Sequence, residues 1–286
     1  MLSIDEKLKK LKNLIASYGS CAVAFSSGVD STFLSYVAKD VLRNNAILIS
    51  VEAQTLTSRD KADMNSYSKN IGLKLIKVPC NQLKIDNFIK NPPKRCYYCK
   101  YALFTKIKEI AKQNGKDIVI DGTNASDCRD YRPGMKALEE LDIKSPLKIC
   151  GLTKDEIRQC LKKWNIKASE KPSSGCLATR IPYGETITQE KLDIIRKCED
   201  YLLNLGIKNI RVRLENKNAR IEVMPNERSF FFNESIMDNI YDTFRSFGCT
   251  YISLDLRGYR TGSLNEILDK GMNQNEWWRI YRYKRC

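Results

Sequence analysis

The stretch Ser26–Ser31 reads Ser-Ser-Gly-Val-Asp-Ser and directly follows the apolar run Ala22–Phe25. A strand that enters a helix through such a turn directs backbone N–H groups and the positive end of the helix dipole at one place, which suits a phosphate. The stretch lacks both the Gly-Lys-Ser/Thr ending of a Walker loop and the spaced glycines of a dinucleotide fingerprint. An ordinary strand-to-helix turn with a serine cap fits the same residues, so both interpretations stay open at this point.

A second polar loop, Asp121–Asp127, follows another apolar run and is rich in turn-forming residues. Asp127 could hold Mg²⁺ through its carboxylate while phosphate oxygens complete the octahedron, and Asp30 could do the same from the first loop. A plain turn between a strand and a helix would use the same residue types. Two carboxylates on neighbouring strand ends would make a better magnesium site than either alone.

Cys96 and Cys99 have the spacing of metal ligands. With 11 cysteines in 286 residues, about 0.4 pairs at this spacing arise by chance, so the spacing alone proves little. The pair follows Pro92-Pro93-Lys94-Arg95, where a loop becomes a helix. We therefore expect the helix dipole and the adjacent bases to lower the pKa of both thiols.

Cys176 stands between Gly175 and Leu177 in a stretch of turn-forming residues, with Arg180 four positions later. A thiol in an exposed basic loop is a better nucleophile than a buried one, although free cysteines more often serve only in packing. The chain has no histidine. This excludes histidine bases and histidine metal ligands, so a soft-metal site would have to use thiolates.

Alternating apolar runs and helical patterns over the first 165 residues predict a parallel sheet of βα units. Ligands bind at the carboxyl ends of such strands, where both polar loops lie. Ser3 with Glu6, and Thr153 with Glu156, predict capping boxes. The predicted strands are Cys21–Phe25, Ala46–Val51, Lys74–Val78 and Ile118–Asp121, and the predicted helices are Ile4–Ser17, Ser31–Leu42, Arg59–Ile71, Lys100–Asn114 and Lys154–Trp164.

The pattern changes after a turn-rich break, which predicts a domain over residues 1–170, a linker over 171–187 and a smaller α+β domain over 188–286. In the smaller domain we expect an antiparallel hairpin. Its elements are predicted as helix Gln189–Leu205, strands Ile210–Leu214 and Ala219–Met224, helix Asn233–Phe247 and strand Tyr251–Leu256.

Strand alternation in the smaller domain puts Arg211 and Arg213 on one face, opposite their apolar neighbours. Arg220 and Glu222 share a face of the partner strand. Three arginines with one carboxylate could bind a phosphate. The simpler interpretation, a solvated sheet face, is favoured by the alternation alone.

The formal net charge of +15 favours an anionic partner such as a nucleotide, a phosphorylated small molecule or RNA. The lysines are scattered rather than packed in runs, so a lysine-rich background accounts for the charge slightly better than an RNA-binding patch. No stretch approaches the roughly 20 apolar residues of a membrane span, and the N-terminus has no apolar signal core. We expect a cytoplasmic protein without a membrane partner.

The motifs together resemble the LarE family, the ATP-dependent sulfur transferases that mature the nickel-pincer nucleotide cofactor of lactate racemase. The first loop is similar to the Ser-Gly-Gly-x-Asp-Ser loop of PP-loop ATPases, with Ser27 in place of the first glycine, which predicts a local difference in the backbone. The resemblance runs over essentially the whole chain. It is carried by Ser26–Ser31, Asp121–Gly134, Pro172–Gly184 (Pro-Ser-Ser-Gly-Cys-Leu-Ala-Thr-Arg-Ile-Pro-Tyr-Gly) and Asp255–Glu266 (Asp-Leu-Arg-Gly-Tyr-Arg-Thr-Gly-Ser-Leu-Asn-Glu).

The resemblance implies a PP-loop ATPase fold (adenine nucleotide alpha hydrolase-like) with a second, smaller α+β domain. It also implies adenylation of a carboxylate of pyridinium biscarboxylic acid mononucleotide, release of pyrophosphate, and displacement of AMP by sulfur. The matching positions assign roles to groups of residues. These are Ser26, Ser27, Gly28, Asp30 and Ser31 for ATP phosphates, Asp127 for Mg²⁺, Arg180, Arg211, Arg213, Glu222, Arg257 and Arg260 for substrate, and Cys176 for sulfur.

The family has two sulfur sources, and the resemblance favours the one in which Cys96, Cys99 and Cys176 hold a [4Fe-4S] cluster that carries an extra sulfide. In the other, Cys176 gives up its own sulfur and becomes dehydroalanine. A zinc site would need a fourth protein ligand, and no spacing recommends Cys80 or Cys128. A separate sulfide donor and a homo-oligomer are further expectations.

Two other functions remain as alternatives, a tRNA thiolation enzyme and a non-catalytic metal or nucleotide carrier. A tRNA thiolation enzyme would also use a PP-loop, cysteines and a basic surface. We do not expect RNA as the substrate, because no appended RNA-binding module is apparent. Because Ser27 replaces a glycine of the usual loop, the carrier hypothesis stays open.

Overall fold

The computed structural model describes residues 2–129, 133–172, 175–260 and 262–267. The chain divides into two compact units. Unit 1 comprises Met1–Ala178 and Tyr183–Leu192, and unit 2 comprises Thr179–Pro182 and Asp193–Cys286. The predicted linker 171–187 therefore contributes residues to both units.

Unit 1 contains a four-stranded sheet in the order β3-β2-β1-β4, and every pair is parallel. This arrangement confirms the predicted parallel sheet of βα units. Ala22 lies beside Ile47 on one side and Val119 on the other, so β1 is central. The strands are β1 (Cys21–Ala24), β2 (Ala46–Ala53), β3 (Leu75–Cys80) and β4 (Val119–Ile120).

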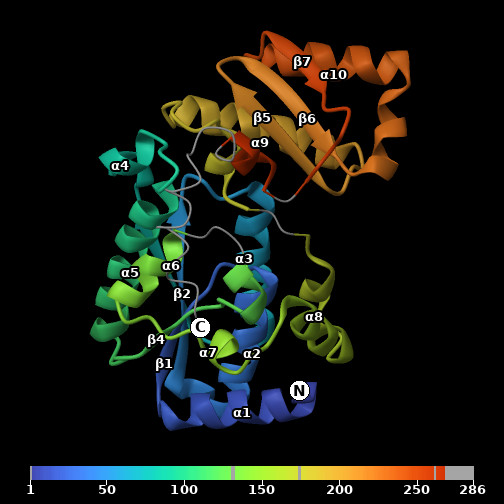
Figure 1. The fold of residues 1–286 in the computed structure, drawn as a ribbon. Coiled ribbons are helices and arrows are strands. Elements are labelled where there is room, and N and C mark those ends of the chain that lie inside the picture. The colour runs from blue at the N-terminus through green and yellow to red at the C-terminus, as the bar shows by residue number, and fades with distance from the viewer. Residues whose placement is uncertain (1, 130–132, 173–174, 261, 268–286) are drawn as a thin grey trace, which may run out of the picture. The chain divides into compact units, whose positions relative to one another are not determined.

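Helices cover both faces of this sheet (Figure 1). One face packs through Val23 and Leu48 against α1, α2, α3 and α8, while the other packs through Ala22 and Ile49 against α5 and α6. Such two-sided cover explains why successive residues of β1 are all apolar. The helices are α1 (Ile4–Ser17), α2 (Val29–Leu42), α3 (Ser58–Ile71), α4 (Asp86–Ile89), α5 (Arg95–Gln113), α6 (Gly134–Glu140), α7 (Pro146–Ile149) and α8 (Lys154–Lys163).

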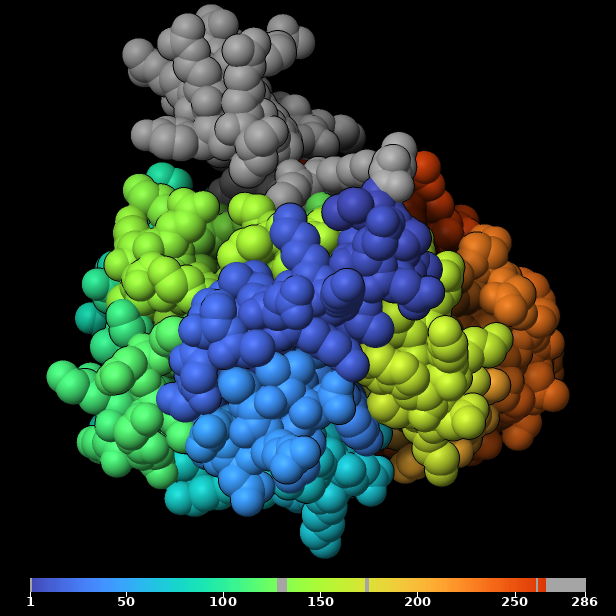
Figure 2. All heavy atoms as spheres, turned by 90° about the horizontal axis from the view of Figure 1, so that it is seen from below, coloured from blue at the N-terminus to red at the C-terminus, as the bar shows by residue number. Residues whose placement is uncertain are grey.

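Helix α1 lies across one end of unit 1, where Figure 2 shows it in the darkest blue. Both predicted capping boxes are present, at the starts of α1 and α8. The carboxylate of the second box also joins the two helices, since Lys7 Nζ lies 2.7 Å from Glu156 Oε1. Local capping and a long-range ion pair therefore reinforce each other here.

Helix α5 begins at Arg95, five residues before the predicted start at Lys100. The prediction was wrong because nothing in Arg95–Cys99 breaks a helix once Pro92-Pro93 has ended the preceding loop. Cys96 and Cys99 consequently lie inside the first turns of the helix.

Unit 2 contains a three-stranded sheet in the order β5-β6-β7. The β5–β6 pair is antiparallel, which confirms the predicted hairpin, and β7 runs parallel to β6. Its elements are β5 (Ile210–Glu215), β6 (Asn218–Val223), α10 (Glu234–Ser246), β7 (Tyr251–Leu254) and, from Asp193 on, α9 (Gln189–Asn204). Within the described ranges of the chain, every helix is too short or too polar to cross a membrane.

Candidate functional site

The loop between β1 and α2 leads directly into the N-terminus of α2, with Gly28 as N-cap. Hydrogen bonds between residues close in sequence shape this β1–α2 loop. Ser26 N–H donates to Ser31 Oγ over 3.3 Å, and Ser31 Oγ–H donates to Gly28 O over 3.2 Å. Gly28 itself has no side chain to cap the helix, so backbone N–H groups at its first turn are available to an anion.

Ser27 is fully buried and has a φ of 55°, in the left-handed region. The serine thus takes a conformation that glycine would adopt freely. The expected local difference from the backbone of the family's loop stays a prediction. Ser27 Oγ donates to Asp60 O over 3.1 Å, and Lys171 Nζ donates to Ser27 O over 3.1 Å. Contacts from two other segments thus hold the unusual residue in place.

Gly122 brings the second polar loop against the first. A Cβ at this position would lie 2.9 Å from Ser31 N and 3.2 Å from Asp30 C, so only glycine allows this approach. The sequence interpretation treated Asp121–Asp127 as a loop near the same sheet edge and missed this role of Gly122. A glycine directly after a buried strand was the available signal.

Asp30 and Asp127 lie close together at this edge. Asp30 Oδ2 lies 2.5 Å from Lys154 Nζ, whereas the buried Oδ1 has no hydrogen-bond partner among the described residues. Burial raises the pKa of Asp30, and the charge of Asp127 adds to that shift. Lys154 and the side chain of Asn124 oppose it. A cation beside Oδ1 would relieve both the burial and the repulsion.

Lys154 was missed as a site residue by the sequence interpretation. It is the first residue of α8, directly after the Thr153 cap, and its ammonium reaches the start of α2. The pairing spans 124 residues of sequence, so no local pattern indicates it. An ammonium at a loop suited to phosphate is a natural second phosphate contact.

The three candidate thiols form a second group in unit 1. Cys96 and Cys99 are one helical turn apart in α5, and Cys176 lies near enough for its charge to raise the pKa of both. The dominant cause of each shift is burial. The expectation of a lowered thiol pKa was therefore wrong for the half-buried Cys99. Cys96 is exposed at the surface, where burial carries less weight against Arg95 and Lys100.

Gln82 links this group to the segment that carries Cys176. Its Nε2 donates to Cys99 Sγ over 3.0 Å, and its Oε1 accepts from Thr55 Oγ1 over 2.8 Å. Thr55 O in turn accepts from Leu177 N over 2.9 Å. The described part of the chain contains no group of three or more Cys, Asp or Glu side chains arranged to hold a single metal ion.

Unit 2 contains an arginine network, which we define as Arg180, Arg211 and Arg213 with Glu199 and Glu222. Arg180 is 1% exposed and binds Glu199 through two bonds, Nε to Oε1 at 2.9 Å and Nη2 to Oε2 at 3.1 Å. Arg213 Nη2 lies 2.8 Å from Glu222 Oε2, and Glu222 is 0% exposed. The favoured interpretation of a solvated sheet face was wrong for Arg213 and Glu222, whereas Arg220 is exposed.

The network holds more positive charge than its carboxylates balance. Burial, together with Arg180 and Arg213, lowers the pKa of Arg211 to about 10. The Arg211 guanidinium carbon lies 4.9 Å from the centre of the Tyr259 ring. Arg213 Nε is buried and has no hydrogen-bond partner among the residues described. Crowded arginines with an unused donor are what an anion would stabilise.

The C-terminal motif packs on the end of β6. A Cβ on Gly258 would lie 2.4 Å from Val223 O, and the backbone N–H groups of Arg257 and Gly258 each donate to Asp255 Oδ1 over 2.8 Å. Arg260 Nη1 lies 3.5 Å from the same oxygen. Arg257 is exposed. Residues 130–132, 173–174 and 261 of the quoted motif stretches lie outside the described residues.

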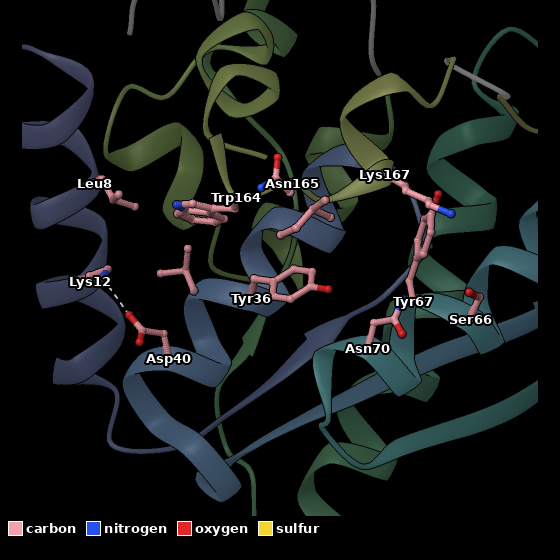
Figure 3. Close-up of a pocket in the computed structure, with 12 residues that line it drawn as sticks. Leu8, Lys12, Tyr36, Asp40, Ser66, Tyr67, Asn70, Trp164, Asn165 and Lys167 are labelled. Atoms are coloured by element: carbon pink, nitrogen blue, oxygen red, sulfur yellow. Dashed lines mark ion pairs between the residues drawn. The ribbon is translucent and has the colours of Figure 1, made fainter. Parts of the chain in front are cut away.

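Unit 1 also has a cavity of about 740 Å³ among the helices that cover one face of its sheet (Figure 3). It is lined by residues of α1, α2 and α3 and by the segment 164–167, including Tyr36, Tyr67 and Trp164. None of the predicted site residues lines it. It approaches the β1–α2 loop indirectly, because Lys171 Nζ lies 5.9 Å from the centre of the Tyr67 ring.

No family profile matches the chain. An uncharacterized protein of Synechocystis sp. is 38% identical over 93% of this chain and 100% of its own length. The pyridinium-3,5-bisthiocarboxylic acid mononucleotide synthase of Lactiplantibacillus plantarum is 32% identical over 94% of this chain and 98% of its own length. The chain belongs to the LarE family. Every motif of this LarE-family chain lies within a match of nearly full length, which confirms the resemblance inferred from those motifs.

A more distant relative indicates the fold class. One of the subunits of the glutamine-hydrolyzing GMP synthase of Thermoplasma volcanium is 25% identical over 70% of this chain and 69% of its own length. This LarE-family chain accordingly has a PP-loop ATPase fold with a parallel sheet and a second, smaller sheet.

Proposed function

We propose that this protein is an ATP-dependent sulfur transferase acting on pyridinium biscarboxylic acid mononucleotide. A substrate carboxylate attacks the α-phosphorus of ATP and pyrophosphate leaves, which gives an acyl adenylate. Sulfur then displaces AMP and leaves a thiocarboxylate. The observation that carries the proposal is the match over 94% of the chain to a synthase named for a bisthiocarboxylic acid mononucleotide.

The β1–α2 loop is the proposed site for the ATP phosphates. Ser26, Ser27, Gly28 and Ser31 shape a turn in front of the α2 N-terminus, where backbone N–H groups and the helix dipole favour an anion. Lys154 Nζ is close enough to Asp30 to turn from that carboxylate to a phosphate oxygen.

Asp30 and Asp127 are the proposed protein ligands of Mg²⁺. The unpartnered Oδ1 of Asp30 and the raised pKa of this carboxyl, due first to burial, support a cation at this position. Mg²⁺ prefers oxygen ligands and keeps several of them from water and phosphate. When bound, the ion would neutralise charge on the triphosphate and on the departing pyrophosphate.

The arginine network is the proposed site for the substrate phosphate. Arg211 and Arg213 supply the guanidinium donors, and Arg180 adds positive charge from its pair with Glu199. The free Nε of Arg213 supports the presence of one more acceptor. Glu222 orients Arg213, whereas Arg260, held near Asp255, and the exposed Arg257 are proposed as outer contacts.

Cys96, Cys99 and Cys176 are the proposed ligands of a [4Fe-4S] cluster. Their mutual electrostatic effect supports one shared site, and each cysteine of a cluster binds a different iron, so the sulfurs need not converge on one ion. A cluster with one open iron would supply sulfide to the adenylate. The three cysteines would have to release their thiol protons to bind the cluster. The raised pKa of the two thiols in α5 opposes that release.

Pyrophosphate release tests the reaction. Purified protein with MgATP should release pyrophosphate with the pyridinium nucleotide and not with tRNA. Release with tRNA alone, with binding that weakens steeply in salt, would identify an RNA-modifying enzyme instead. No release with either substrate would favour a carrier.

Intact mass and iron content test the sulfur source. A cluster predicts that reconstituted iron is lost in Cys96→Ala, Cys99→Ala and Cys176→Ala but kept in Cys249→Ala, a buried cysteine of unit 2. A sacrificial donor predicts that turnover removes the mass of hydrogen sulfide at Cys176. Normal iron binding by all three variants would refute the cluster.

A further inference from the structure

Lys171 is a buried lysine that the proposed reaction does not use. Its side chain is 2% exposed, and its Nζ lies 2.9 Å from Asp60 Oδ1 and 2.7 Å from Asp63 Oδ2. The same nitrogen donates to Ser27 O over 3.1 Å and lies 3.4 Å from Ser27 Oγ. Two carboxylates and the Ser27 carbonyl thus surround an ammonium that has three N–H donors. Lys171 is therefore not arranged to bind a phosphate itself.

Ser27 is the residue that Lys171 holds. Its φ of 55° brings Cβ close to the following carbonyl, which is unfavourable for any residue except glycine. The Ser27 carbonyl is fixed by Lys171, and the Ser27 hydroxyl is fixed by Asp60 O. The left-handed turn therefore depends on contacts from outside the loop, because the residue does not favour it intrinsically.

Two carboxylates beside the buried ammonium explain why a lysine is tolerated at position 171. Asp60 and Asp63 lie in the first turns of α3, and together they carry two negative charges against the single charge of Lys171. The ammonium is thereby kept behind the loop with its charge neutralised. The ammonium contacts the loop at Ser27, through the carbonyl oxygen and, over a longer distance, the hydroxyl.

We propose that Lys171 is a positioning residue for ATP: it holds the β1–α2 loop in the phosphate-binding conformation that Ser27 would not keep alone. The inference rests on the proposed function, in which this loop binds the ATP phosphates. Lys171 and Ser27 form a functional pair, in which the lysine compensates for the loss of a glycine. A glycine at position 27 would make the lysine largely dispensable for ATP binding.

Titration of the full-length protein with MgATP tests the pair. Lys171→Met should weaken ATP binding about tenfold, because a charged hydrogen bond to a buried carbonyl is lost. The double variant Lys171→Met with Ser27→Gly should regain most of that loss, because glycine adopts the left-handed conformation without help from the lysine. Arg158→Met is the matched control. Arg158 Nη2 donates to Lys171 O over 2.7 Å, so this variant loosens the same segment without touching Ser27.

A purely structural role for Lys171 predicts a different outcome. In that case Lys171→Met has a lower melting temperature, and adding Ser27→Gly to it fails to restore the affinity for ATP. That failure, or an unchanged affinity in Lys171→Met, overturns the inference. If Lys171→Met does not fold, Lys171→Met with Asp63→Asn removes one charge of each sign and serves in its place.

Hydrogen exchange of the loop separates this inference from the proposed function. Without ATP, amides of residues 26–31 should exchange faster in Lys171→Met than in the wild type and in Arg158→Met. A wild-type protein that binds no MgATP refutes the proposed function, and the exchange result then decides the inference by itself. Equal exchange in all three proteins overturns the inference even if ATP binds.

Discussion

The β1–α2 loop of unit 1 and the arginine network of unit 2 both concentrate hydrogen-bond donors, but the donors differ in kind. The loop offers backbone N–H groups at the start of α2, within residues that are at most five apart in sequence. The network offers guanidinium groups whose partners extend from Thr179 to Ser263. In the proposed function, the loop would therefore recognise an anion through backbone geometry, and the network would do so through charge.

The two regions are also held in order by different means. In the loop, small residues allow close approach, as between Gly122 and Ser31. In the network, buried carboxylates hold buried arginines in place. We therefore expect substitutions in the network to leave unpaired charges, and substitutions in the loop to create clashes or relieve strain.

The largest effect should come from Arg180→Met. This variant leaves Glu199 buried without its bidentate partner, and breaking a buried pair from one side costs about 3–5 kcal/mol of unfolding free energy. Urea unfolding measures it. Lys12→Met is the control, because Lys12 and Asp40 form an exposed pair worth about 0–1 kcal/mol. Equal losses in the two variants would show that the network is not held by buried charge.

Gly122→Ala should have a smaller effect, about 1–3 kcal/mol, because the added Cβ meets the backbone of the β1–α2 loop. Thermal and urea unfolding check this loss. Gly134→Ala is the matched control, since its Cβ would meet mainly the flexible end of Lys100, with Cδ at 2.7 Å. If Gly134→Ala is the more damaging change, the loop is not the tightly packed region we describe.

In the group of three candidate thiols, burial opposes deprotonation, which predicts that stability depends on pH. The pKa of Cys99 is raised in the folded state, first by burial. Below the pKa of the unfolded thiol, the folded and unfolded states both keep the proton, so the free energy of unfolding does not depend on this group there. Above that pKa, near 8.5, the unfolded state loses its proton first, and stability falls by at most about 1.4 kcal/mol per pH unit.

Unfolding at pH 7, 8, 9 and 10 measures this slope in the reduced, metal-free protein. The wild type should lose stability with rising pH more steeply than Cys99→Ala. A wild type that gains stability relative to Cys99→Ala over this range would mean that the folded thiol has a lowered pKa, as the sequence alone suggested.

Local patterns predicted much of this molecule. The capping boxes, the parallel strands around β1 and the hairpin of unit 2 depend on neighbouring residues, and each could be inferred from spacing. Lys171 and Ser27 are 144 residues apart, so no pattern could bring them together. The raised pKa of Cys99 was unpredictable for a related reason. It depends on burial within the fold and on the charge of Cys176 from another segment, while the hydrogen bond from Gln82 opposes the shift.

Ser27→Gly should have the smallest effect, and it tests whether the loop is strained. Glycine removes the cost of a Cβ at a φ of 55°, about 1–2 kcal/mol. It also loses the hydroxyl bond to Asp60 O, worth about 1 kcal/mol, and adds about 0.4–1 kcal/mol of unfolded-state entropy. These terms nearly cancel, so we expect a net change within about 1 kcal/mol by urea unfolding.

Ser27→Ala separates the terms of that balance. Alanine keeps the Cβ and the left-handed strain but loses the hydroxyl, so it should be less stable than both serine and glycine at this position. Serine then survives in the loop because its hydroxyl and Lys171 together offset the strain. If alanine is as stable as serine, the hydroxyl contributes nothing, and the carbonyl contact with Lys171 alone must hold the turn.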